Sequence, residues 1–192
     1  MARAYVHPAD GPRAALVLGH GAGGGVGAKD LIAAMDAALA VGVTVALVEQ
    51  PYRVAGRRSP APAAQLDAAW VAVVPALQQG ELAGLSLIVG GRSSGARVAC
   101  RTADATGALA VLCLAFPLQP RRRSNPPPSR LPELAAVQVP VLVVQGERDP
   151  FGIPPAGRRR KVVTVDGDHS LKTDLPAVFE AVRSWLADRL SS

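Results

Sequence analysis

The stretch LSLIVGGRSSG, residues 85–95, decides the fold of this chain. It begins as a short apolar run that is typical of a buried strand, and residues 91–95 read G-x-S-x-G. This pattern between a strand and a helix matches a nucleophile elbow, in which small residues let a tight turn raise one hydroxyl above the sheet edge. We therefore interpret Ser93 as a nucleophile, with an ordinary Gly/Ser turn as the alternative in a chain that holds 19 glycines.

Five more apolar runs resemble that strand. They span residues 14–20, 43–50, 108–116, 139–146 and 161–167. Continuous apolar runs are typical of parallel strands covered on both faces. Apolar positions at steps of three and four lie between them, most clearly from Leu175 to Leu190, and predict helices. The alternation predicts a three-layer α/β fold with a mostly parallel sheet of about six to seven strands, formed as one domain over residues 1–192.

The composition excludes several classes of protein. Of the 192 residues, 49% are hydrophobic and 19% are charged, which excludes a disordered chain. The net charge of +6 fits a nucleic-acid binder, but it also fits an arginine-rich genomic bias, since 18 of the 21 basic residues are arginine. Aromatic residues make up only 4%, which is poor for stacking on bases, so we expect no nucleic-acid partner.

The cysteines, the first residues and the length of the apolar runs indicate the cellular compartment and whether the chain contacts a membrane. Cys100 and Cys113 form no disulfide framework, and we expect both to be buried thiols. The first residues hold no apolar signal segment, and the longest apolar run, 108–116, is far short of the ~20 residues that span a bilayer. These features predict a cytoplasmic protein without a membrane partner.

A serine nucleophile needs a base, and the chain has three histidines. His7 precedes every predicted strand, and we expect it on the surface, whereas His20 ends the strand 14–20. His169 follows the last strand, which fits the chain order Ser, Asp, His. We interpret His169 as the general base, with a solvated loop histidine as the alternative.

The base needs a carboxylate that orients it. Asp149 lies just past the strand 139–146, at the strand end where α/β sheets collect functional groups. Glu147 competes for the role, whereas Asp166 and Asp168 are too close in sequence to His169 for an easy side-chain pair. We predict that Asp149 is the acid.

A second glycine-rich stretch, HGAGGG at 20–25, follows the strand 14–20. In an acyl-transfer enzyme such a turn supplies one backbone N–H to an oxyanion hole. We expect Ala22 to supply it, give or take one residue, and Ser94 to supply the other.

The same glycines allow a competing interpretation. Gly19, Gly21 and Gly24 match G-x-G-x-x-G, and Glu49 ends the next strand. A Rossmann-type dinucleotide binder would use such an acid on a ribose, typically ~20 residues after the motif. Here the acid lies about 30 residues on, and the motif leaves the later serine, aspartate and histidine unexplained.

The segment FPLQPRRRSNPPPSRLP, residues 116–132, is rich in proline and arginine. Its composition predicts an exposed loop inserted within the domain. Arg121–Arg123 form either a solvated basic loop or a site that recruits an anionic substrate or carrier, since arginine forks suit carboxylates and phosphates.

Together these motifs resemble the α/β-hydrolase superfamily, and most closely its small, lidless, dienelactone-hydrolase-like members. One branch of these includes a testis-expressed protein and subunit 3 of the nonspecific lethal (NSL) histone-acetyltransferase complex. The segments that carry the likeness are 20–25, 48–62, 90–95, 116–120, 146–152 and 166–172. The resemblance implies Ser93 as nucleophile, Asp149 as acid and His169 as base. True dienelactone hydrolases have a cysteine at the position of Ser93.

These interpretations predict a serine hydrolase that cleaves a small or carrier-presented ester or thioester through an acyl-enzyme. They require no metal and no organic cofactor. No segment is long enough for a helical lid, so we expect an open site, with Tyr52 and Phe151 as candidate lining residues. A non-catalytic interaction module with the same fold is the alternative, and its signature would be an incomplete set of the three residues.

Overall fold

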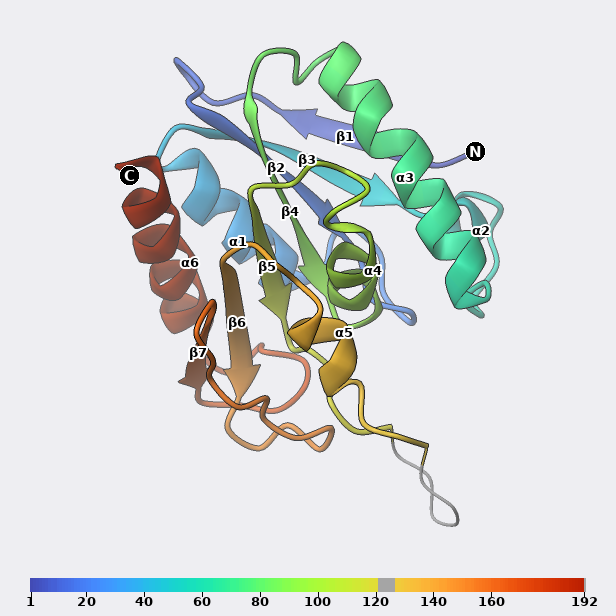
Figure 1. Cartoon of the computed structure of the whole chain (residues 1–192), viewed down its shortest axis with the longest axis vertical. Helices are drawn as coiled ribbons and strands as arrows, with labels where there is room; N and C mark the ends of the chain where they lie inside the picture. The colour runs from blue at the N-terminus through green and yellow to red at the C-terminus, as the bar shows by residue number, and fades with distance from the viewer. Residues whose placement is uncertain (121–126, 192) are drawn as a thin grey trace.

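The computed structural model describes residues 1–120 and 127–191, which form a seven-stranded sheet between two layers of helices (Figure 1). The strands are β1 (Arg3–His7), β2 (Ala14–Gly19), β3 (Val43–Glu49), β4 (Ser86–Arg92), β5 (Ala110–Leu114), β6 (Val141–Gly146) and β7 (Arg160–Val165). The helices are α1 (Lys29–Leu39), α2 (Pro51–Val54), α3 (Ala63–Gln79), α4 (Ser94–Thr102), α5 (Leu131–Ala135) and α6 (Leu175–Leu190).

The sheet is mostly parallel. Its strand order is β1-β3-β2-β4-β5-β6-β7, and in the described part of the chain only β1 runs antiparallel to its neighbour. The predicted three-layer α/β fold is confirmed, and each of the six predicted strands is present with ends shifted by a few residues.

Both faces of the central strands β2 to β6 are buried, which explains why these strands read as continuous apolar runs. On β2, Ala15 and Val17 pack toward α3 and α4, whereas Leu16 and Leu18 pack toward α1 and α6. Figure 1 shows these two helix pairs on opposite sides of the sheet. Since each of these four side chains is at most 1% exposed, no polar alternation remains in the sequence of the strand.

Strand β1 lies outside the predicted set, and the placement of His7 before every strand is wrong, because His7 ends β1. Arg3 and Tyr5 are exposed, whereas Ala4 and Val6 pack against the core. Two small apolar residues in a five-residue edge strand give a weaker signal than the apolar runs of the central strands.

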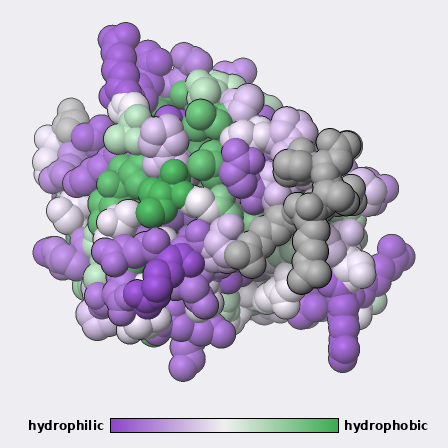
Figure 2. All heavy atoms as spheres, turned by 90° about the horizontal axis from the view of Figure 1, so that it is seen from below, coloured by the Kyte–Doolittle hydropathy of each residue, from purple (hydrophilic) through white to green (hydrophobic). Residues whose placement is uncertain are grey.

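The carboxyl ends of the parallel strands form one edge of the sheet. Figure 2 shows the molecular surface seen from that side, where a patch of apolar residues lies among polar ones. In the described residues, the long helices that cover the faces of the sheet are α1, α3, α4 and α6. The remaining two helices, α2 and α5, have four and five residues and are too short for a helical lid. The predicted loop 116–132 ends at Arg130, because α5 begins at Leu131 with Pro132 in its first turn, where proline is tolerated. Arg121–Arg123 lie outside the described residues.

Candidate active site

Ser93 lies in a sharp turn between β4 and α4. Its backbone has φ +51° and ψ −108°, a region that residues other than glycine rarely adopt. The Ser93 N–H donates a hydrogen bond of 2.9 Å to the Leu114 carbonyl of the neighbouring strand end. Strained backbone that the surrounding structure holds in place is typical of functional sites.

Glycine is required on both sides of this turn. A Cβ atom at Gly91 or Gly95 would overlap the carbonyl oxygen of Gly19, at the end of β2. The two glycines therefore let β2, β4 and the first turn of α4 approach closely, and this contact sets the height of Ser93 above the sheet.

We expect Gly95→Ala to lower the free energy of unfolding by about 3 kcal/mol, because the new methyl group meets backbone that cannot move aside. Urea unfolding of the variant measures this loss. Gly27→Ala is the matched control, since a Cβ atom there meets open space. Equal losses for the two variants would contradict the packing argument.

The structure brings Ser93, His169 and Asp149 together in one chain of hydrogen bonds. His169 Nδ1 lies 2.8 Å from Asp149 Oδ2, and His169 Nε2 lies 2.9 Å from Ser93 Oγ. A carboxylate only accepts hydrogen bonds, so Nδ1 carries the proton, and in the neutral ring Nε2 is left to accept from the serine hydroxyl. This tautomer is the one that a general base needs.

The competing carboxylates point elsewhere. Glu147 is exposed, Asp166 pairs with Arg148 at 2.6 Å, and Asp168 accepts hydrogen bonds from Ser170. Of the four acids weighed from the sequence, Asp149 is the one whose carboxylate contacts the imidazole.

The Asp149 carboxylate is fully buried and held by two further donors. The Phe151 N–H donates to Oδ1 at 2.8 Å, and Gln145 Nε2 donates to Oδ2 at 2.7 Å. Gln145 also accepts from the Phe116 N–H at 2.9 Å, which ties β6 to the end of β5. Sequence reasoning missed Gln145, although a glutamine at the end of an otherwise apolar strand is a usable signal.

Ser93, Ser94 and Ala22 line one pocket of about 330 Å³. The Ser94 N–H lies in the first turn of α4, where a helix leaves its amide hydrogens without intrahelical partners. Ala22 follows β2 in the glycine-rich loop, next to Gly21, where an added Cβ atom would lie 3.5 Å from Ser93 Cβ. The two residues expected to donate to an oxyanion therefore border the serine.

The two candidate lining residues differ in position. The Phe151 ring lies 4.5 Å from the His169 ring and borders the pocket. Tyr52 is only 5% exposed, and its hydroxyl donates to the Ala22 carbonyl at 2.9 Å. Tyr52 is thus part of the core that holds the Ala22 loop, and its position does not favour substrate contact.

His20 also holds this loop. Its Nδ1 donates to the Gly21 carbonyl at 2.8 Å, and its Nε2 accepts from the Gln50 N–H at 3.1 Å. Burial lowers the pKa of the imidazole, so the ring is neutral at pH 7. A protonated ring would carry an N–H at Nε2 as well, which would face the Gln50 N–H and break this hydrogen bond.

We expect this histidine to make stability depend on pH. Because its folded pKa is lowered, the unfolded chain takes up a proton first, so stability is full above about pH 6.5 and falls as pH drops through that value. The slope is at most about 1.4 kcal/mol per pH unit. Urea unfolding between pH 5 and 7.5 should show a flatter profile for His20→Asn than for the wild type; parallel profiles would contradict the assignment.

Arg92 occupies the first x position of the G-x-S-x-G motif, directly before Ser93, and its side chain connects three segments. Its Nε donates to Asp30 Oδ2 at 2.8 Å, and one of its terminal nitrogens donates to the His169 carbonyl at 3.1 Å. Burial raises the pKa of Asp30, and the nearby Arg92 charge opposes that rise. The pair joins the start of α1 to the elbow and to the histidine loop, and sequence reasoning missed it because its members lie 62 residues apart.

In the described ranges, no group of three or more His, Cys, Asp or Glu side chains could hold a metal ion. No helix there is long and apolar enough to cross a membrane.

Comparison with known proteins gives a family match and many structural matches. The model of a family described as an alpha/beta hydrolase domain matches residues 12–177. Among curated proteins, no sequence relative of the chain is found.

Three solved structures illustrate the likeness. Est1E from Butyrivibrio proteoclasticus, with ferulic acid bound, has 16% identity and a TM-score of 0.77, over 100% of this chain and 96% of that one. A serine hydrolase without a lid from Xanthomonas campestris has 18% identity and a TM-score of 0.76, over 100% and 90%. A dienelactone hydrolase from Anabaena variabilis has 14% identity and a TM-score of 0.73, over 97% and 89%. At these identities the likeness establishes the fold.

Proposed function

The chain belongs to the α/β-hydrolase domain family, and on this premise we propose that it is a serine hydrolase that cleaves a small or carrier-presented ester or thioester. The observation that carries the proposal is the continuous chain of hydrogen bonds from Ser93 through His169 to Asp149. The strained turn at Ser93 and the fully buried Asp149 carboxylate also support it.

The reaction proceeds in two halves. Ser93 Oγ attacks the carbonyl carbon while His169 Nε2 takes the hydroxyl proton, and Asp149 stabilises the imidazolium. The oxyanion accepts hydrogen bonds from the N–H groups of Ala22 and Ser94, each worth about 3 kcal/mol in the transition state. His169 then gives its proton to the leaving alcohol or thiol, which leaves an acyl group on Ser93.

Water completes the cycle. With the leaving group gone, His169 Nε2 removes a proton from a water molecule, which attacks the acyl-enzyme carbonyl. The second tetrahedral intermediate collapses, the acid departs and Ser93 regains its proton. These steps balance without a metal or an organic cofactor.

The size of the site favours short acyl groups. Binding pockets for small molecules typically enclose about 300–1,000 Å³. The pocket beside Ser93, at about 330 Å³, lies at the lower end of that range. A short acyl chain fits such a volume, and an open rim suits an acyl group presented by a carrier.

A chain-length series of p-nitrophenyl esters, with the matching acyl thioesters, tests the proposal. We expect turnover that is fastest for short acyl chains, with a burst of p-nitrophenol stoichiometric with enzyme wherever hydrolysis of the acyl-enzyme is slower than its formation. Absence of turnover across both series would contradict the proposal and favour the non-catalytic interaction module.

A further inference from the structure

The pocket beside Ser93 is strongly cationic. Arg97, Arg101 and Arg130 all line it, together with Phe151 and the two serines of the elbow. Arg97 and Arg101 come from α4, the helix that directly follows Ser93, and Arg130 immediately precedes α5. The pocket therefore places three guanidinium groups around the space next to the nucleophile.

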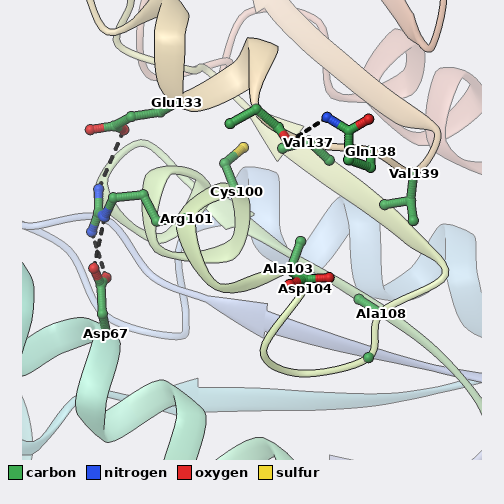
Figure 3. Close-up of a pocket in the computed structure, with 12 residues that line it drawn as sticks. Asp67, Cys100, Arg101, Ala103, Asp104, Ala108, Glu133, Val137, Gln138 and Val139 are labelled. Atoms are coloured by element: carbon green, nitrogen blue, oxygen red, sulfur yellow. Dashed lines mark hydrogen bonds and ion pairs between the residues drawn. The ribbon is translucent and has the colours of Figure 1, made fainter.

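Two of these arginines are neutralised by carboxylates. Arg97 makes two hydrogen bonds to Glu133, at 2.8 and 2.6 Å. Arg101 lies between Asp67 and Glu133, as Figure 3 shows, and contacts Asp67 at 2.8 and 2.6 Å and Glu133 at 3.3 Å. These paired contacts fix both side chains in place and pair the charge of each with a carboxylate.

Arg130 is different. Its side chain donates to the Pro117 carbonyl at 3.1 Å, and within residues 1–120 and 127–191 it has no carboxylate in ion-pair distance. Burial lowers the pKa of Arg130, and the charges of Arg97 and Arg101 lower it further, whereas the charge of Glu133 raises it. Among the residues that the structure describes, three cations thus face two carboxylates, and Arg130, the cation without an ion pair there, donates one side-chain hydrogen bond, to the Pro117 carbonyl.

We propose that Arg130 binds an anionic group of the substrate, a carboxylate or a phosphate, so that the scissile compound is an acidic ester or thioester. This inference rests on the proposed function and narrows its substrate class. A guanidinium fork matches the paired oxygens of such groups, and partial burial strengthens the interaction relative to open water. The bound anion would also balance the excess positive charge of the pocket.

A matched pair of substrates tests the inference. Mono-p-nitrophenyl glutarate and p-nitrophenyl valerate both have five-carbon acyl chains, and the glutarate ends in a carboxylate where the valerate ends in a methyl group. We expect the wild type to prefer the glutarate in kcat/KM, and Arg130→Gln to lower the glutarate-to-valerate ratio by about 10–100-fold. Arg130→Lys, which keeps the charge but loses the fork, should give an intermediate ratio. Arg183→Gln on α6 removes the same charge on the opposite face of the sheet and should keep the wild-type ratio.

A second pair of substrates separates the two sources of the anion. S-acetyl-phosphopantetheine carries a phosphate on the leaving thiol, and S-acetyl-pantetheine is its neutral analogue. A ratio that falls in Arg130→Gln only for the phosphate pair assigns the anion to the leaving group, whereas a fall only for the glutarate pair assigns it to the acyl chain. An unchanged ratio for both pairs overturns the inference.

Binding measured on a variant that cannot turn over tests the anion site independently of hydrolase activity. In the Ser93→Ala background, calorimetry should give a lower Kd for monomethyl glutarate than for methyl valerate, or a lower Kd for phosphopantetheine than for pantetheine. Adding Arg130→Gln should make the two Kd values of each pair equal. If no ester is cleaved but this difference is present, the proposed function fails and the anion site stands. If neutral esters are cleaved and neither anion is preferred in rate or in binding, the anion site fails and the hydrolase stands.

Discussion

Replacing Ser93 by alanine is expected to lower kcat for p-nitrophenyl ester hydrolysis by about 10⁴–10⁶-fold. The variant loses the Ser93 Oγ atom, which lies 2.9 Å from His169 Nε2, so no acyl-enzyme forms, and the residual rate comes from the oxyanion donors and substrate binding. Alanine keeps the Cβ atom, so the strain at φ +51° and the free energy of unfolding should change little.

The control is Ser86→Ala, an exposed serine at the opposite end of the same strand, which should keep the wild-type rate. Stopped-flow release of p-nitrophenol at saturating substrate measures all three proteins. A Ser93→Ala variant that keeps more than a tenth of the wild-type kcat would exclude this serine as the nucleophile.

Asp149→Asn is expected to lower kcat by about 10⁴-fold. An asparagine amide can donate to His169 Nδ1, which would move the ring proton to Nε2, where it blocks proton removal from Ser93. The carboxylate also accepts hydrogen bonds from the Phe151 N–H at Oδ1 and from Gln145 Nε2 at Oδ2. In either orientation, the NH2 group of the asparagine would therefore face one of these two donors and leave it without an acceptor. We therefore also expect the free energy of unfolding to fall by about 1–3 kcal/mol.

The control for this variant is Glu147→Gln, which removes the competing carboxylate two residues away. Glu147 is exposed and should leave kcat unchanged. The kcat of the two variants, measured at equal pH with a soluble short-chain ester, separates the two carboxylates. A large loss in Glu147→Gln with little loss in Asp149→Asn would reverse the assignment of the acid.

Sequence reasoning reached the central site because its signals are local. The apolar run before Ser93 and the small residues around it specify a strand, a turn and a helix within eleven residues, residues 85–95. Asp149 follows the buried strand β6, and His169 follows the edge strand β7 beside it. Because parallel strands end at one edge of the sheet, these strand positions predict that the two side chains meet.

The residues that sequence reasoning missed act over long separations. Arg92 meets Asp30 across the sheet edge, and Gln145 bonds the backbone at Phe116, 29 residues earlier. Nothing in the local pattern of hydrophobicity specifies either partner. The role of Tyr52 depends on the direction of its hydroxyl toward the Ala22 loop, which a residue type alone does not reveal.

Covalent labelling with a fluorophosphonate, read by intact mass and peptide mapping, tests the central claim most directly, because these probes react preferentially with an activated serine. The account predicts one adduct per chain, located on Ser93, which disappears in Ser93→Ala and is strongly slowed in a His169→Ala variant. An unlabelled wild-type protein, or an adduct that persists in Ser93→Ala, would contradict it.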